Sequence, residues 1–173
     1  LTNLWERMPY LYTDISFISR YAKEQFATKF GSGLAKLDDA LLPLIVDRCS
    51  GEVVRGSDYD HDVVLVIGNK FKHKAVDMVF RELPKEKNRI YYVLGEVFEV
   101  LRDDVKFLTP GMVSEQEMSN LMKSSKFIVF PTFSEGFGFP ILEALQYKKN
   151  IYCRPLPPFV EIYNSIDAEM QGH

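Results

Sequence analysis

The sequence predicts an α/β fold, with a Rossmann-like parallel sheet covered by helices on both faces. From residue 63 onward, short runs of β-branched and aromatic residues alternate with amphipathic stretches. These runs are apolar at nearly every position, which is typical of strands buried on both faces. Several of them end in a glycine or a glycine-containing turn, which favours a ligand site at the carboxyl ends of the strands.

Before residue 63 the pattern is less regular. Residues 14–31 have a helical period, and Ser19 can cap a helix that Gly31 ends. Its apolar stripe would consist of Ala22, Phe26 and Phe30. Residues 41–47 predict a short strand at an edge or in a connector, because Pro43 cannot donate a backbone hydrogen bond. Residues 48–62 are polar and acidic, which predicts a solvated linker loop.

The later elements follow one another closely. Strands are expected at residues 63–68, 90–95, 105–108, 127–130 and 150–153. Helices are expected at residues 74–84, 96–103 and 114–123, and from Pro140 onward. The predicted inward side chains are Val76, Val79, Phe80 and Leu83 in the first of these helices, and Ile141, Leu142, Leu145 and Tyr147 in the last. Ser114 and Glu117 form a capping-box pattern. No helix is expected after the last strand.

Composition narrows the function classes. A chain of 173 residues suits one domain with part of another. Its net charge of −3 provides no positive surface potential that would attract nucleic acid, so we do not expect a nucleic-acid partner. Cys49 and Cys153 are too few for a disulfide framework, so we expect reduced thiols and a cytoplasmic protein. Neither a membrane span nor a signal peptide is visible. Because the chain begins at Leu1, we expect it to be a piece of a longer protein.

The most informative stretch runs from residue 127 to residue 145. A strand is followed by a turn with two glycines and then by a helix, so backbone N–H groups can approach an anionic ligand. Glu135 and Glu143 are separated by seven residues and would repel a plain phosphate. They suit a ligand that carries hydroxyl groups as well as phosphate. The simpler alternative is that Glu135 caps the helix and Glu143 is a solvated surface residue.

The string PTFSEGFGFPILEA, residues 131–144, resembles the signature of the retaining GT-B glycosyltransferases, the glycosyl transferases group 1 family. The resemblance implies that this chain contains one half of a GT-B fold, its C-terminal donor-binding domain. Residues 1–47 would then be the end of the N-terminal acceptor domain and the connector, and residues 48–62 the acidic linker. Residues 63–173 would be the Rossmann-like nucleotide-sugar-binding domain, truncated at its C-terminus.

A basic segment follows the strand at 63–68. Lys70, Lys72 and Lys74 crowd a helix N-terminus, where the helix dipole prefers anions, and a bound diphosphate would remove that conflict. The alternative is a solvated basic turn, with His73 as a helix cap or an exposed residue. The family resemblance places Lys74 on the lysine that contacts the donor diphosphate. Asn69 stands where the family commonly has arginine, although a variant with Gly-Asn and His-Lys also occurs in the family.

The resemblance also implies a set of site residues. The catalytic residues would be Glu135 and Lys74, with Lys74 stabilising the leaving diphosphate and Glu135 holding sugar hydroxyls. Glu143 would hold the ribose hydroxyls. The donor-binding set would be Gly68, Asn69, Gly136, Phe137, Gly138, Phe139 and Glu143. No metal and no cofactor beyond the nucleotide-sugar donor would be needed.

The sequence also contains a candidate metal site. Asp58, Tyr59 and Asp60 form a D-x-D string of the kind that holds a metal in the other glycosyltransferase architecture, and His61 follows it. Three-residue strings often occur by chance, and no strand precedes this one. The sequence therefore favours a site without metal.

By resemblance, the full-length protein would be a hexosyltransferase that transfers a sugar, with retention of configuration, from a nucleotide-diphosphate donor to a saccharide or lipid-linked acceptor. Cell-surface polysaccharide synthesis in the cytoplasm, or at the inner membrane surface, is the expected setting, and peripheral membrane association stays open. Because the acceptor domain is missing, we expect the chain alone to bind donor weakly and to transfer nothing. The alternatives are a non-catalytic nucleotide-sugar-binding module and an epimerase or phosphorylase of the same architecture.

Overall fold

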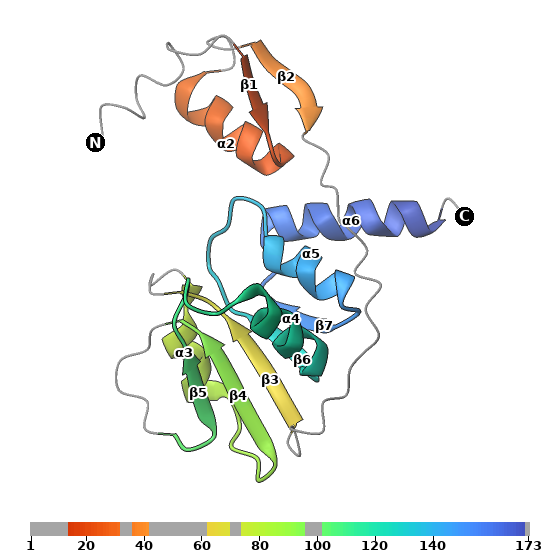
Figure 1. Cartoon of the computed structure of the whole chain (residues 1–173). Helices are drawn as coiled ribbons and strands as arrows, with labels where there is room; N and C mark the ends of the chain where they lie inside the picture. The colour runs from red at the N-terminus through yellow and green to blue at the C-terminus, as the bar shows by residue number, and fades with distance from the viewer. Residues whose placement is uncertain (1–13, 32–35, 42–61, 70–73, 96–101, 172–173) are drawn as a thin grey trace. The chain divides into compact units, whose positions relative to one another are not determined.

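The computed structural model of the chain describes residues 14–31, 36–41, 62–69, 74–95 and 102–171 (Figure 1). The chain divides into two compact units. The first consists of the described parts of Leu1–Ile45 and Pro155–His173, together with Glu135–Gly138. The second consists of the described parts of Val46–Ser134, together with Phe139–Arg154.

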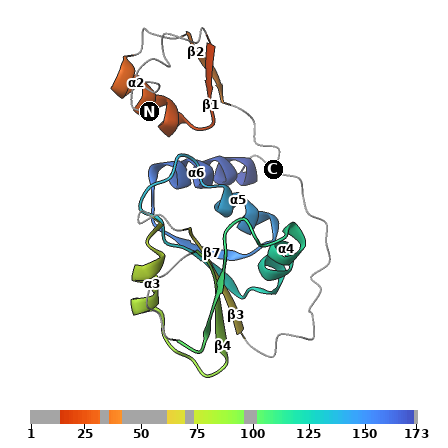
Figure 2. The same cartoon turned by 60° about the vertical axis from the view of Figure 1, so that its left-hand side comes forward.

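The second unit is built on a five-stranded parallel sheet in the order β5-β4-β3-β6-β7. Its strands are β3 (Asp62–Ile67), β4 (Arg89–Leu94), β5 (Val105–Leu108), β6 (Phe127–Phe130) and β7 (Asn150–Cys153). Its helices are α3 (Val76–Glu82), α4 (Glu115–Ser124) and α5 (Phe139–Gln146). Figure 2 shows α3 on one face of this sheet, with α4 and α5 on the other. The predicted fold class is confirmed.

The central strand β3 explains why the apolar runs are continuous. Five of its six residues are buried, because helices cover both faces of the sheet. On the α3 side the buried cluster consists of Val64, Val66, Val76, Phe80, Tyr91 and Val93. Val79 and Leu83 pack against this cluster, so all four inward positions predicted for the helix are confirmed.

The strand order reverses between β3 and β6. The chain crosses from β3 to β4 on one side of this pair and from β6 to β7 on the other. The register pairs Val64 with Phe127 and Val66 with Val129, so the two strands end side by side. A reversal of this kind leaves a crevice at the carboxyl ends of the strands, where open α/β sheets bind ligands.

The first unit contains β1 (Asp14–Phe17), α2 (Arg20–Phe30), β2 (Lys36–Leu41) and α6 (Pro157–Gln171). The strands β1 and β2 are parallel. Ser19 caps α2 as predicted, since its Oγ accepts a hydrogen bond of 3.0 Å from the Ala22 N–H. Gly31 ends the helix at a φ of 83°, a left-handed conformation that favours glycine.

Several predicted elements need correction. The first part of the expected helical region, Asp14–Phe17, is the strand β1, which pairs with the unpredicted strand β2. Two adjacent aspartates interrupt the apolar pattern of β2 and hid it in the sequence. The helix α6 was also missed, because prolines mark its beginning, although proline is tolerated in a first helical turn. In α5 the buried residues are Ile141 and Ala144, whereas Leu145 is 42% exposed.

The capping box that Ser114 and Glu117 predicted is present at α4. Other predictions fall on residues outside the described ranges. These are the strand at 41–47 beyond Leu41, most of the loop at 48–62, residues 96–101 of the expected helix, the D-x-D string with His61, and Cys49, Lys70, Lys72 and His73.

A partly buried arginine, Arg102, joins the end of α3 to the turn before β5 in the second unit. Arg102 forms a bidentate ion pair with Asp104, at 2.9 Å from Nε to Oδ1 and 2.6 Å from Nη2 to Oδ2. Its Nη1 donates to the carbonyls of Phe80 and Leu83 at the end of α3. This single side chain therefore satisfies carbonyls that the helix leaves open and holds the turn before β5. The hydrogen bonds from Arg102 hold the pKa of the Asp104 carboxyl below its usual range.

The ion pair makes stability depend on pH. Because the pKa of Asp104 is lower in the folded state, the pair stabilises the protein above about pH 4, and this contribution is lost as the pH falls through the lowered pKa. We expect Asp104→Asn to reduce the unfolding free energy at pH 7 by about 2 kcal/mol. In urea unfolding, the difference from wild type should shrink as the pH falls below the ordinary aspartate pKa of 3.8.

The matched control is Asp103→Asn. Asp103 pairs with Lys85 at the surface, where the two side chains are 81% and 64% exposed, so its loss should leave stability unchanged. A pH-independent loss in Asp104→Asn, or an equal loss in Asp103→Asn, would contradict this assignment.

Gly68 lies where β3 turns towards α3, and the space there excludes a side chain. An added Cβ would lie 2.0 Å from Val76 Cγ2. We expect Gly68→Ala to destabilise the protein by about 1–3 kcal/mol through overpacking. In chemical denaturation, the double variant Gly68→Ala/Val76→Ala should lose less unfolding free energy than the sum of the losses in the two single variants. Strictly additive losses would show that the clash does not limit this position.

Candidate functional site

The carboxyl ends of the parallel strands in the second unit form a rim that carries several of the predicted site residues. Gly68 and Asn69 follow β3, Gly95 follows β4, and Arg154 follows β7. Parallel strands place these ends at the same edge of the sheet. Turns at this edge can therefore contribute to one ligand site.

At the carboxyl ends of β3 and β4, the backbones of the two connecting segments contact each other. The Gly68 N–H donates to the Leu94 carbonyl at 2.9 Å. A Cβ added to Gly95 would meet the backbone N and O of Asn69 at 3.4 Å. The backbone of Asn69 therefore lies close to Gly95, and a Cβ at Gly95 would be in van der Waals contact with it.

Lys74 reaches the point where the strand order reverses. Its Nζ lies 5.5 Å from the centroid of the Phe130 ring, at the last residue of β6. This cation–π geometry places an ammonium group from the β3 connection over the end of the neighbouring strand. The next residue, Ala75, is buried and has a φ of 52°, a left-handed conformation that costs a residue with a Cβ about 1–2 kcal/mol. The packing of the second unit thus fixes the backbone next to this lysine.

Residues 131–134, which follow β6, are held by two side chains. Thr132 is fully buried, and its Oγ1 donates to the Ser134 carbonyl at 2.9 Å. Arg154 donates from Nε to the Pro131 carbonyl at 3.2 Å, and its guanidinium lies 4.0 Å from the centroid of the Phe133 ring. The segment that leads to Glu135 is therefore ordered from within and from β7.

The sequence prediction missed both of these side chains. A threonine two residues before a serine is a recognisable local turn signal, because its hydroxyl can bond the backbone two residues on. Arg154 had no such signal, since only the adjacency of β6 and β7 brings it to Pro131.

Glu143 lies one turn into α5, the helix that begins at Phe139. Its side chain is accessible to solvent, yet partial desolvation raises the pKa of its carboxyl above the usual range. Within the described residues, no side chain donates a hydrogen bond to this carboxylate. A partly desolvated carboxylate of this kind is suited to accept hydrogen bonds from a ligand.

The glycine turn, Glu135–Gly138, belongs to the first unit. Gly138 has a φ of 115°, which favours glycine, whereas a Cβ added at Gly136 would meet no atom within 4 Å. The protein's own packing therefore does not require glycine at 136, and its absent side chain leaves the backbone accessible. Ser19 Oγ donates to the Gly136 carbonyl at 2.9 Å.

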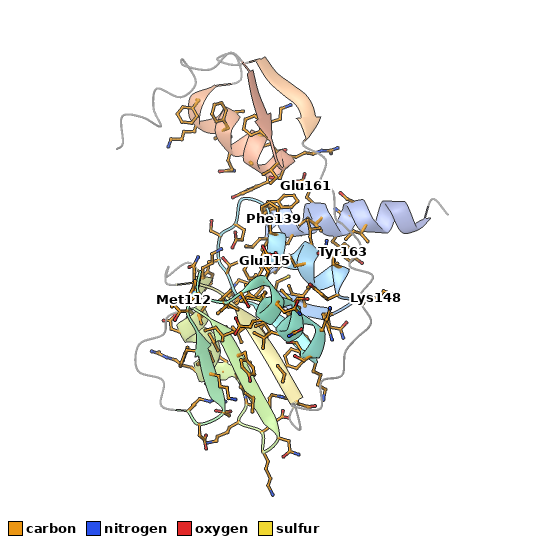
Figure 3. All side chains as sticks on the ribbon, in the orientation of Figure 1. Met112, Glu115, Phe139, Lys148, Glu161 and Tyr163 are labelled. Carbon is orange, nitrogen blue, oxygen red and sulfur yellow. The ribbon has the colours of Figure 1, made fainter. Side chains whose placement is uncertain are left out.

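The N-terminus of α2 is occupied by a carboxylate of the protein itself. Glu161, which projects from α6 (Figure 3), accepts hydrogen bonds from the Arg20 N–H at 2.9 Å and the Tyr21 N–H at 3.3 Å. A carboxylate at this helix end is favoured by the helix dipole. The sequence prediction missed this contact because the two partners are separated by 140 residues or more.

The predicted site residues are thus distributed over two units. Gly68, Asn69, Lys74, Phe139 and Glu143 belong to the second unit, and the glycine turn with Glu135, Gly136, Phe137 and Gly138 belongs to the first. Within each unit the structure supplies a charged or backbone group suited to a phosphate- and hydroxyl-bearing ligand. That both groups converge on one ligand stays a prediction.

No cluster of three or more His, Cys, Asp or Glu side chains that could hold a metal ion occurs among the described residues. No helix in the described part of the chain is long and apolar enough to cross a membrane.

Comparison with models of known protein families gives a match over the described sheet. A family model described as "Glycosyl transferases group 1" matches residues 61–162, more than half of the chain. No curated protein matches the chain significantly. The matched region contains the whole five-stranded sheet, the lysine at the strand-order reversal and both signature glutamates. The chain therefore belongs to the glycosyl transferases group 1 family.

Proposed function

We propose that this chain carries the C-terminal, donor-binding half of a retaining GT-B glycosyltransferase and that it binds a nucleotide-diphosphate sugar. The observation that carries the proposal is the position of Lys74, whose ammonium lies over Phe130 where the strand order reverses. Ligands of open α/β sheets bind at this reversal, and a lysine there suits an anionic ligand. Family membership supports a sugar nucleotide as that ligand.

In the proposed reaction, the bond between the sugar's anomeric carbon and the diphosphate oxygen breaks. The bonding electron pair leaves with the diphosphate, so negative charge develops on its oxygens. Lys74 and backbone N–H groups of the glycine turn stabilise this charge, which is the main catalytic contribution that fixed donors make. Asn69 replaces the arginine common at this position, so less positive charge comes from the protein at this point.

The two glutamates hold hydroxyl groups. Glu143 accepts hydrogen bonds from the ribose hydroxyls, which would compensate the partial desolvation that raises the pKa of its carboxyl. Glu135 accepts hydrogen bonds from the transferred sugar. The backbone from Gly136 to Phe139 lines the sugar and the phosphates. In this account neither a metal ion nor a further cofactor takes part.

In the full-length protein, the sugar passes with retention to a saccharide or lipid-linked acceptor held by a second domain. We place this hexosyltransferase in cell-surface polysaccharide synthesis, in the cytoplasm or at the inner membrane surface. The second candidate is a non-catalytic nucleotide-sugar-binding module, which the replacement of the family arginine by Asn69 would favour. A product assay on the full-length protein with labelled donor distinguishes the two, since only the enzyme transfers label.

The test of the binding site is a thermal-shift panel of UDP, GDP, ADP and their hexose conjugates. We expect the nucleotides of one base to stabilise the wild-type chain. At a ligand concentration of a hundred times the dissociation constant, the unfolding free energy should rise by about 2.7 kcal/mol. Lys74→Ala should weaken binding of that nucleoside diphosphate about tenfold or more, since it removes a charge-assisted contact with phosphate.

The matched control is Lys126→Ala. Lys126 pairs with Asp62 at the amino ends of the strands. Lys126→Ala therefore removes one positive charge, as Lys74→Ala does, but at the opposite edge of the sheet. If no nucleotide stabilises the wild type, or if both lysine variants weaken binding equally, the proposed donor site is wrong.

The role of Glu143 is tested with a ligand that lacks one hydroxyl group. Wild type should bind the 2′-deoxy form of the preferred nucleoside diphosphate about tenfold more weakly than the ribose form, because one hydrogen bond to a carboxylate is lost. Glu143→Gln should lose affinity for the ribose form and show a smaller ratio between the two forms in isothermal titration calorimetry. Glu82→Gln, on the exposed end of α3, should keep the wild-type ratio. An unchanged ratio in Glu143→Gln would remove this residue from the ribose site.

A further inference from the structure

Ser19 connects two segments of the first unit that are far apart in the sequence. It is 1% exposed, and its Oγ takes part in two hydrogen bonds. The oxygen accepts from the Ala22 N–H at 3.0 Å and so caps α2. The same hydroxyl donates to the Gly136 carbonyl at 2.9 Å, across 117 residues of sequence. A hydroxyl has one proton to donate, so this bond uses its whole donor capacity.

The bond to Gly136 constrains more than one atom. A peptide group is planar, and in its trans form the carbonyl of one residue and the N–H of the next point in opposite directions. Holding the Gly136 carbonyl therefore also fixes the direction of the Phe137 N–H. Gly136 is exposed and has no side chain to restrict its backbone, so the turn itself supplies little of this restraint.

We propose that Ser19 is a positioning residue for donor binding, because its hydroxyl sets the peptide plane between Gly136 and Phe137 in the glycine turn. This inference rests on the proposed function, in which the backbone of this turn lines the sugar and the phosphates. The capping of α2 orients the hydroxyl, since the oxygen that accepts from Ala22 must direct its proton elsewhere. The N-terminal segment of the chain thus contributes to the site through the order that it imposes on the turn.

Glu161 supports the same arrangement. Its carboxylate binds the Arg20 and Tyr21 N–H groups, so the first turn of α2 is held from α6 directly beside Ser19. The backbone next to Ser19 is therefore held independently of the side-chain bond between Ser19 and Gly136. A substitution that removes only the hydroxyl should leave this anchor in place.

The experiment compares three variants of Ser19 in the 173-residue chain, with UDP, GDP and ADP as the probes. Ser19→Gly removes the donor to Gly136, while glycine is a well-tolerated residue at a helix N-cap. We expect it to weaken binding of the preferred diphosphate about tenfold in isothermal titration calorimetry. Ser19→Thr keeps the hydroxyl and should bind within about twofold of wild type. Ser19→Ala loses both the cap and the donor and should bind as weakly as Ser19→Gly.

Ser125→Ala is the matched control for general destabilisation. Ser125 is also a serine at 1% exposure whose Oγ donates to a backbone carbonyl, that of Leu121 at 2.6 Å. It lies just before the amino end of β6, at the edge of the sheet opposite to the rim. Its loss should lower the melting temperature and leave nucleotide affinity unchanged.

The outcomes separate the inference from the proposed function. If no probe binds the wild-type chain, the proposed function fails at its first step. If wild type binds and Ser19→Gly binds equally well, the donor site stands and the role of Ser19 is overturned. Equal losses in Ser19→Gly and Ser125→Ala would also overturn it, since the effect would then be general destabilisation. If Ser19→Thr is too unstable to measure, the comparison of Ser19→Gly with Ser125→Ala still decides.

Discussion

The parallel pairing of β3 with β6 is the constraint on which the site in the second unit depends. The chain leaves these neighbouring strands in opposite directions, so their connections diverge from the carboxyl ends of the two strands. The register fixes where both strands end, and Lys74 reaches across to the last residue of β6. The apolar residues that bury β3 on both faces therefore also determine where a charged side chain can meet a ligand.

Around this pair, the rim is shaped mainly by backbone constraints. Gly68 has no space for a side chain, Ala75 is held in a left-handed conformation, and Thr132 is buried with its hydroxyl on a nearby carbonyl. Each of these features limits the freedom of a segment that follows a strand. A segment that is already ordered loses less conformational entropy when a ligand binds. Affinity therefore depends on these residues as well as on the charged ones.

The sheet and its alternation with helices could be predicted because buried parallel strands leave continuous apolar runs, as at residues 63–67. Local capping signals at Ser19 and Ser114 were also reliable, since they depend on residues three positions away. The contacts of Arg154, Glu161 and Arg102 could not be predicted, because each joins segments that only the tertiary fold brings together. For the same reason, the signature string identifies Glu135 and Glu143 but gives no information on what orders the turn between them.

The most direct test of the account is a crystal structure of this chain with the nucleoside diphosphate that stabilises it most. We predict that the diphosphate lies at the carboxyl ends of β3 and β6, with a phosphate oxygen within hydrogen-bonding distance of Lys74 Nζ and the ribose hydroxyls on Glu143. A nucleotide bound away from this rim, or bound there with no phosphate oxygen within hydrogen-bonding distance of Lys74 Nζ, would contradict it.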